Sequence, residues 1–325
     1  MSQADVKPKQ PNAPQITIVE VGPRDGLQIL KSILPTGHKK RWIAAAAAAG
    51  VREIEVCSFV PAAVVPGMVD AVEITRYART IPGLLTTTLA PNAKGAEKAF
   101  AAGAQKVSMP ISVSVPHNLA NIRKTHAQSI DELRRVVDLR AGYPLGSRPE
   151  IEIGLSTSFG CSIAGAVPER DVLALAEKCL AAGADRVTPA DTIGIGNPAQ
   201  VKRLYAALFK AFGKAKIGGS HFHDTRGQGL ANALAALEAG VTSFDASLAG
   251  LGGCPFAPGA SGNVCTEDLV WMLEEMGLST GIDLAKLLAC RDILKDGLPN
   301  EKLSGHLADV GLARTQSGGR VAAAR

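Results

Sequence analysis

Two histidines separated by a single residue end an apolar run in the segment His221-Phe222-His223-Asp224. Because side chains alternate between the two faces of a β-strand, His221 and His223 are expected to project to the same side. Two imidazoles in this arrangement can bind a divalent metal ion, since imidazole is a common metal ligand in proteins. A histidine pair at a solvated turn is the alternative interpretation. Whether the pair binds a metal must therefore be judged from the rest of the chain.

A carboxylate that can complete such a site follows the first apolar run of the chain, in Arg24-Asp25. Asp25, His221 and His223 together supply one oxygen and two nitrogen ligands. This mixed set suits Mn²⁺ or Mg²⁺, and also Zn²⁺, Co²⁺ or Fe²⁺. A coordination position left open on such an ion would act as a Lewis acid on a substrate oxygen.

Other polar residues lie where apolar runs end. Glu55 belongs to the second run and Asp191 follows the sixth, although either carboxylate could instead form an ion pair that fills the interior of the fold. Residues 250–259 are dense in glycine and proline, a composition typical of a mobile lid. Cys254 at the centre of this segment could transfer a proton once the lid closes, or it could be merely a small loop residue.

The scaffold that brings these residues together can be inferred from a repeating pattern. Eight short β-branched or apolar runs alternate with helical runs, which include 36–49, 66–79, 129–141 and 198–212. A repeat of roughly 30–40 residues implies parallel strands joined by helical crossovers. The strands are expected at 16–21, 53–59, 84–89, 106–113, 150–156, 186–190, 216–223 and 243–248. Eight such units predict an α/β fold, the (β/α)8 TIM barrel, whereas a doubly wound open sheet would normally use fewer strands.

In such a barrel, catalytic residues come from the carboxyl ends of the strands, which is where all the polar residues above lie. We expect one domain over residues 15–298, with added C-terminal helices in 281–298. Residues 1–14 have the composition of a disordered leader, and residues 299–325 form a tail that is expected to be partly disordered.

The composition excludes several other classes of protein. Of the 325 residues, 46% are hydrophobic, 20% are charged and 4% are aromatic, and the formal charge of +5 is scattered, so nucleic-acid binding is not expected. No apolar run approaches the roughly 20 residues that span a bilayer. The six cysteines show no CxxC spacing, and the amino terminus lacks a signal or transit pattern, so a reducing, cytoplasmic location is expected.

Five motifs give the chain a family resemblance. They are Val-Gly-Pro-Arg-Asp-Gly-Leu-Gln at 21–28, Glu-Val-Cys-Ser-Phe-Val at 55–60, Asp-Thr-Ile-Gly at 191–194, His-Phe-His-Asp-Thr at 221–225 and Ala-Gly-Leu-Gly-Gly-Cys-Pro-Phe-Ala-Pro-Gly-Ala-Ser-Gly-Asn at 249–263. From about residue 16 to residue 288 the chain resembles the 3-hydroxy-3-methylglutaryl-CoA lyase family of metal-dependent TIM-barrel lyases. The cysteine motif distinguishes these lyases from isopropylmalate-type synthases, which have a similar barrel and histidine pair.

The resemblance implies roles for particular residues. The divalent metal, Mg²⁺ or Mn²⁺, would be bound by Asp25, His221, His223 and Asn263. The catalytic residues would be Arg24, which stabilises the enolate oxygen of the departing acyl-CoA, and Cys254, the general acid and base, together with Glu55, Asp191 and His221. Asp191 would also orient Arg24. Substrate binding would involve Arg24, Gln28 and Ser58. A homodimer or higher homo-oligomer is expected by analogy with such barrels.

The sequence departs from the family pattern near the expected pocket, at Ile29-Leu30, Val115 and the segment 158–163, which includes Ser162. We therefore expect cleavage of a 3-hydroxyacyl-CoA, by default 3-hydroxy-3-methylglutaryl-CoA to acetyl-CoA and acetoacetate. The same chemistry on citramalyl-CoA or on a longer branched 3-hydroxyglutaryl-CoA is the nearest alternative. An acyl-CoA condensing synthase and a non-catalytic protein that binds metal or CoA are the more distant ones.

Overall fold

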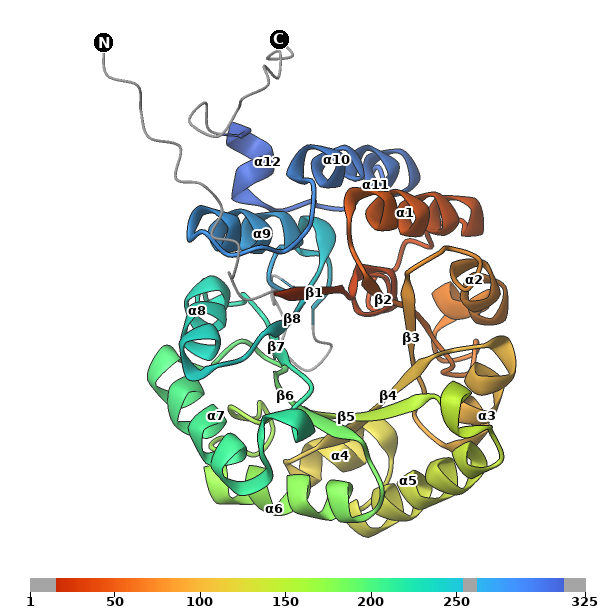
Figure 1. Ribbon diagram of the computed structural model, residues 1–325, viewed down its shortest axis with the longest axis vertical. Helices are drawn as coiled ribbons and strands as arrows, with labels where there is room; N and C mark the ends of the chain where they lie inside the picture. The colour runs from red at the N-terminus through yellow and green to blue at the C-terminus, as the bar shows by residue number, and fades with distance from the viewer. Residues whose placement is uncertain (1–15, 254–261, 313–325) are drawn as a thin grey trace.

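A closed barrel of parallel strands forms the centre of the protein (Figure 1). The computed structural model describes residues 16–253 and 262–312, and within them eight strands follow one another around the barrel in sequence order, with the last beside the first. Their bounds are β1 Thr17–Glu20, β2 Glu53–Ser58, β3 Leu85–Leu89, β4 Lys106–Ser112, β5 Glu150–Ser156, β6 Arg186–Asp191, β7 Ser220–Phe222 and β8 Ser243–Ala246. The predicted (β/α)8 barrel is therefore confirmed.

Helices surround this barrel on the outside (Figure 1). The helices that follow successive strands are α1 Thr36–Ala49, α2 Ala71–Ala78, α3 Ala93–Ala102, α5 His126–Ala141, α6 Glu169–Ala181, α7 Pro198–Phe212, α8 Gly229–Ala239 and α9 Thr266–Glu275. The additional C-terminal helices are α10 Leu284–Ala289, α11 Arg291–Gly297 and α12 His306–Val310, which lie beside α1 and α9. The expected C-terminal extension is thus present, and α12 belongs to the part that the sequence assigned to a tail.

Some elements differ from the sequence-based expectation, each for a local reason. The helix expected over 66–79 is divided into a 3-10 turn, Pro66–Met68, and the shorter α2. An additional helix, α4 Val115–Ile122, precedes α5, and α5 begins at His126 because Thr125 and Gln128 form a capping box. The seventh strand is only three residues long, because the expected run begins at the end of a 3-10 turn, Lys214–Lys216, and pairs only through isolated bridges at Ile217 and His223.

A buried charge network lies inside the barrel near the amino ends of the strands. The Nζ atom of Lys106 lies 2.7 Å from a carboxylate oxygen of Glu53 and 2.9 Å from one of Glu152. The hydroxyl of Thr87 donates to Glu53 at 2.9 Å, and that of Thr188 donates to Glu152 at 2.5 Å. Because each buried charge has partners of opposite sign, the network can occupy a site that apolar residues normally fill.

A second buried carboxylate, Glu20, connects the end of β1 to the segment after β8. It accepts hydrogen bonds from the backbone N–H of Gly22 at 2.8 Å, the backbone N–H of Leu248 at 2.9 Å and the hydroxyl of Thr266 at 2.8 Å. Complete burial raises the pKa of Glu20 to about 7, although these hydrogen bonds favour its ionised form. Glu20 therefore joins the two chain segments that carry Asp25 and Asn263 into the site.

We expect the Glu20→Gln variant to differ from the unaltered protein in the pH dependence of its stability. Because the folded protein holds the proton of Glu20 more tightly, this carboxyl's contribution to stability is complete below pH 4.5 and is lost as the pH rises through about 7. Across this window the unaltered protein should lose on the order of 3 kcal/mol relative to the variant. Urea unfolding of both proteins at several pH values measures the difference, and a difference that stays constant would contradict the prediction.

None of the helices in the described part of the chain combines the length and the apolar character that crossing a membrane would require.

Candidate metal centre and active site

A cavity of about 740 Å³ opens at the carboxyl ends of the strands and is lined by half of the ten site residues predicted from the sequence. Its wall includes Arg24, Asp25, Gln28, His221 and His223. Segments that are far apart in the sequence thus meet at one place, as the parallel barrel requires.

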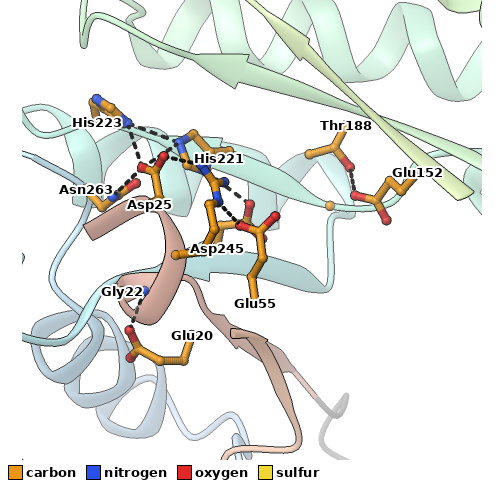
Figure 2. Close-up of polar contacts among 12 residues, drawn as sticks. Glu20, Gly22, Asp25, Glu55, Glu152, Thr188, His221, His223, Asp245 and Asn263 are labelled. Carbon is orange, nitrogen blue, oxygen red and sulfur yellow. Dashed lines mark hydrogen bonds and ion pairs between the residues drawn. The ribbon is translucent and has the colours of Figure 1, made fainter. Parts of the chain in front are cut away.

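The two histidines and Asp25 face one another (Figure 2). The Nε2 atoms of His221 and His223 are 3.1 Å apart, and they lie 3.9 Å and 3.7 Å from Oδ2 of Asp25. The expectation that both imidazoles project to the same side is confirmed. Among the described residues, this is the group of histidine, cysteine and acidic side chains that could hold a metal ion, with all three ligand atoms within 4.8 Å of one another.

A turn of π-helical form, Gly22–Gly26, directs Arg24 and Asp25 into the cavity. The carbonyl of Val21 accepts hydrogen bonds from the backbone N–H of Arg24 at 3.1 Å and of Asp25 at 2.7 Å. Gly22 is required at the start of this turn, because a Cβ atom there would lie 2.6 Å from the ring of Trp42. The sequence Gly-Pro-Arg-Asp-Gly therefore sets the direction of two adjacent charged side chains by backbone geometry.

Asn263 lies beside Asp25 (Figure 2). Its Nδ2 atom donates to Oδ2 of Asp25 at 2.7 Å and to the carbonyl of Leu251 at 3.1 Å. Its Oδ1 atom is buried and has no hydrogen-bond partner in the described part of the chain. This amide oxygen is free to serve as an additional metal ligand beside one carboxylate and two imidazoles. The four residues therefore fit a divalent ion.

Asp245 in β8 is a member of the site that our sequence analysis missed. Its Oδ2 atom lies 3.1 Å from Nδ1 of His221 (Figure 2). A carboxylate on this nitrogen places the ring proton on Nδ1 and leaves the Nε2 lone pair facing Asp25 and His223. The sequence feature that could have indicated Asp245 is a charged residue between Phe244 and Ala246 in the middle of a short strand. By contrast, the described residues offer no hydrogen-bond partner to Nδ1 of His223.

Replacing Asp245 by asparagine is expected to weaken divalent-metal affinity by about 10-fold to 100-fold, because the orientation and basicity of His221 depend on this carboxylate. Isothermal titration of Mn²⁺ into the purified protein measures the change directly. Asp292→Asn is a suitable control, since Asp292 is an exposed residue of α11 that contacts only Lys295 among the ion pairs of this region. Unchanged metal affinity in Asp245→Asn would show that His221 does not depend on this contact.

Arg24 is held by two carboxylates. Its Nε atom donates to Oε2 of Glu55 at 2.5 Å, and its Nη1 atom donates to Oδ1 of Asp25. Burial disfavours the charge on Arg24, but Asp25 and Glu55 outweigh burial and raise the pKa of the guanidinium. The side chain therefore carries a permanent positive charge into a buried cavity, where it acts more strongly than in water.

The expectation that Asp191 orients Arg24 is wrong. One carboxylate oxygen of Asp191 accepts the backbone N–H of Ile195 at 3.0 Å, and the other accepts that of Gly196 at 2.9 Å. Asp191 thus fixes the turn after β6, and Glu55 is the residue that holds Arg24 from the neighbouring strand. The sequence could not distinguish the two, because Glu55 lies within β2 and Asp191 ends β6, and both strands belong to the same barrel.

Three titratable side chains of the site have pKa values that differ from their ordinary values, and each shift has an identifiable cause. Burial would raise the pKa of Asp25, but Arg24 and then the two histidines hold it well below its ordinary value. Burial would lower the pKa of His221, whereas the hydrogen bond to Asp245 and the charge of Asp25 raise it. Burial raises the pKa of Glu55 to about 7, in spite of the opposing charge of Arg24. Glu55 is therefore able to exchange a proton near neutral pH.

The remaining predicted site residues lie at different distances from the cavity. Gln28 belongs to its wall, whereas Ser58 is fully buried at the end of β2 and does not line it. Cys254 lies outside the described residues, and its neighbour Gly253 lines the cavity.

The three positions at which the sequence departs from the family pattern, Ile29, Val115 and Ser162, do not line the cavity either. An altered pocket around those positions is therefore not what the structure shows, because Val115 and Ser162 face solvent.

Comparison with known proteins gives consistent matches over nearly the whole chain. The model of the HMGL-like family matches residues 15–294. The hydroxymethylglutaryl-CoA lyase of Bacillus subtilis is 40% identical over 279 residues, which are 86% of this chain and 92% of that protein. The mitochondrial hydroxymethylglutaryl-CoA lyase of Mus musculus is 40% identical over 296 residues, which are 91% of this chain and 89% of that protein.

A solved structure extends the comparison to three dimensions. The HMG-CoA lyase of Acinetobacter baumannii, in complex with coenzyme A and 3-methylmalate, superposes with a TM-score of 0.86 at 40% sequence identity. The match covers 94% of this chain and 98% of that one.

Proposed function

The chain belongs to the HMGL-like family, and on this premise we propose that it is a carbon–carbon lyase that cleaves 3-hydroxy-3-methylglutaryl-CoA to acetyl-CoA and acetoacetate. The observation that carries this proposal is the convergence of Arg24 with Asp25, His221 and His223 on one cavity. A buried guanidinium beside a metal-binding group is suited to a reaction in which negative charge develops on a thioester oxygen.

In this reaction the 3-hydroxyl group loses its proton and becomes a carbonyl as the C2–C3 bond breaks. The electron pair of that bond passes to C2, which gives the enolate of acetyl-CoA, and a proton is then delivered to C2. Arg24 supplies a positive charge that Glu55 and Asp25 have already oriented. Because no reorganisation is needed during the reaction, this charge stabilises the enolate oxygen more than water could.

Asp25, His221 and His223, with Asn263 as the fourth ligand, are the residues that would bind the divalent ion. Proteins of the HMGL-like family generally depend on such an ion. We propose Mg²⁺ or Mn²⁺, because the ligand set combines carboxylate and amide oxygens with imidazole nitrogens. When bound, the ion supplies a Lewis acid that lowers the cost of removing the hydroxyl proton. Asp25 also keeps Arg24 in place, so one carboxylate serves both parts of the site.

Proton transfer is assigned to Cys254 and Glu55. Glu55 has a pKa of about 7 and one carboxylate oxygen, Oε1, that is buried without a hydrogen-bond partner in the part of the chain described. The assignment of Cys254 rests on its place in the glycine-rich motif beside Gly253, which lines the cavity. Gln28 is proposed to contact the substrate from the cavity wall, and Asp191 to act through the turn that it fixes.

Cys254→Ala is expected to lower kcat by about 10²-fold to 10⁴-fold with a smaller change in KM, because a positioned acid or base contributes in this range. Steady-state kinetics with 3-hydroxy-3-methylglutaryl-CoA measure both constants. Cys179→Ala, a change in helix α6 remote from the cavity, is the matched control and should retain turnover. If Cys254→Ala kept its full kcat, the cysteine would have no part in proton transfer.

The experiment that tests the proposed function is product analysis by mass spectrometry. The purified protein is incubated with 3-hydroxy-3-methylglutaryl-CoA and with Mn²⁺, Mg²⁺ or a chelator. Metal-dependent release of acetyl-CoA and acetoacetate is the expected result. Release of the same products at an equal rate in the chelator would contradict the metal assignment, and absence of both products would contradict the proposed reaction.

An acyl-CoA substrate is supported by the coenzyme A complex of the relative from Acinetobacter baumannii. Two further expectations remain predictions, namely a cytoplasmic location and assembly into a homodimer or higher homo-oligomer. Light scattering coupled to size exclusion measures the oligomeric state.

A further inference from the structure

The inner wall of the barrel is unusual on one side. In most (β/α)8 barrels the inward-facing positions carry bulky branched side chains, which fill the interior. In this protein seven residues of β4, β5 and β6 line the cavity, and all of them except Glu152 are small, namely Ser108, Pro110, Gly154, Ser156, Thr188 and Ala190. We refer to the part of the cavity that these six residues line as the inner hollow. Because the residues are small, space remains where the barrel core would otherwise be packed.

The inner hollow is continuous with the active site and closed at its far end. Residues of the hollow and the metal-binding group belong to the wall of the same cavity. Glu152 also lines this cavity, and Figure 2 shows Glu152 and Thr188 apart from the cluster around His221. The ion pair of Glu152 with Lys106, together with Glu53, closes the barrel toward the amino ends of the strands. A CoA thioester that enters from the carboxyl ends can therefore place only its acyl end there.

Gly154 contributes most clearly to the open space. A Cβ atom built at Gly154 would have the carbonyl oxygen of Met109 as its nearest neighbour, at 4.0 Å. Gly154 pairs with Pro110 on one side and Thr188 on the other, so it lies in the middle of the small-residue wall. It is also absent from the glycines with positive φ, so the backbone does not require glycine at this position. The missing side chain leaves volume that a ligand can occupy.

The hollow is polar as well as open. The hydroxyl groups of Ser108 and Ser156 have no hydrogen bond to any residue in ranges 16–253 and 262–312, although both side chains border the cavity. The hydroxyl of Thr188 is already engaged with Glu152. Leu89, the partner of Ser108 on β3, also lines the cavity, so the hollow offers both apolar surface and hydroxyl groups. Two hydroxyls that are free to bind a ligand suit an acyl substituent that carries a hydrogen-bonding group.

We propose that the inner hollow binds the C3 substituent of the acyl group, and that the enzyme also cleaves 3-hydroxyacyl-CoA thioesters whose C3 substituent is longer than methyl and ends in a polar group. Gly154 is the residue that determines this specificity. The inference rests on the proposed function, and the bond changes are the same: the C3 hydroxyl becomes a carbonyl, C2 leaves as the enolate of acetyl-CoA and is protonated. The long substituent stays on the keto product.

Three substrates test the proposal in parallel. They are 3-hydroxy-3-methylglutaryl-CoA and two analogues in which a 4-hydroxybutyl or a pentyl chain of equal length replaces the 3-methyl group. Release of acetyl-CoA gives kcat/KM for each. The unaltered protein should cleave the hydroxybutyl substrate with kcat/KM within about tenfold of that for the methyl substrate, and should favour it over the pentyl substrate.

Gly154→Val should lower the ratio of kcat/KM for the hydroxybutyl substrate to that for the methyl substrate by about 30-fold, because the added side chain occupies the hollow. Gly154→Ala adds a single methyl group to the same wall and should cause a smaller decrease, which provides a second variant if valine prevents folding. Gly146→Val is the control, since Gly146 has open space around it in an exposed turn, and it should leave the ratio unchanged. Ser108→Ala should reduce the preference for hydroxybutyl over pentyl by about fivefold.

The outcomes separate the two proposals. Cleavage of the methyl substrate with no cleavage of either longer one would overturn the inference and leave the proposed function intact. An equal ratio in Gly154→Val and the unaltered protein would also overturn it, because the chain would then lie elsewhere. If no substrate releases acetyl-CoA, the proposed function itself fails and the inference fails with it.

Discussion

Arg24→Met is expected to lower kcat by about 10³-fold, which corresponds to about 4 kcal/mol of lost transition-state stabilisation. Methionine keeps much of the volume of the side chain but removes the charge that we propose stabilises the enolate oxygen. It also leaves Glu55 and Asp25 without the partner that binds both of them. Steady-state kinetics with 3-hydroxy-3-methylglutaryl-CoA measure the effect, and KM should change far less than kcat.

Two further variants distinguish a catalytic loss from a structural one. Arg41→Met removes an exposed arginine of α1 that pairs with Asp296, and it should have the activity of the unaltered protein. Arg24→Lys keeps a positive charge but cannot reproduce the two-sided contact with Glu55 and Asp25, so its kcat should lie between those of the methionine variant and the unaltered protein. Equal kcat values for Arg24→Met and the unaltered protein would refute the role of Arg24.

Asp25→Ala is expected to abolish activity by a different route, through loss of the metal. Asp25 is the carboxylate of the proposed ligand set, and its low pKa means that it is ionised throughout the neutral range. Its removal should weaken Mn²⁺ affinity by more than about 100-fold, since the two imidazoles and an amide would then provide no negative charge. Metal content after dialysis and calorimetric titration of Mn²⁺ measure this loss without reference to turnover.

The metal measurement keeps this prediction separate from that for Arg24. In Arg24→Met the ligands remain, so metal affinity should change much less than kcat does. Asp131→Asn alters an exposed acid of α5 and serves as a control for the change in net charge. Full metal occupancy together with full activity in Asp25→Ala would show that the metal site lies elsewhere in the protein.

Much of the scaffold could be predicted from the sequence because its determinants are local. The bounds predicted for α1 and α7 agree with the structure at both ends, since a glycine or a proline marks where each helix stops or starts. The same-side placement of His221 and His223 was predicted from strand geometry, and a β-bridge to Asn263 continues the extended backbone at His223, one residue beyond β7. The closing of the barrel followed from the number of repeated strand–helix units, and this number does not depend on any individual contact.

The partners of the charged residues were decided only by the tertiary structure. Asp25 and Asn263 are 238 residues apart in the sequence, and their hydrogen bond depends on how the two loops meet above the barrel. The residue that holds Arg24 is Glu55 rather than Asp191, although both acids belong to strands of the barrel. Asp245 was missed because a single acid in a short strand gives no indication of the histidine that it faces on the neighbouring strand.

The shape of the cavity could likewise not be predicted from sequence patterns. Val115 and Ser162, where the chain departs from its family, face solvent, whereas the space beside the site comes from Gly154 and its small neighbours on three different strands. Periodicity and turn residues determine which segments become strands and helices, and so the sequence by itself specifies the barrel and the end at which chemistry occurs. Hydrogen-bond partners and empty volume depend on distances of a few ångströms between distant segments, and only the folded structure defines these.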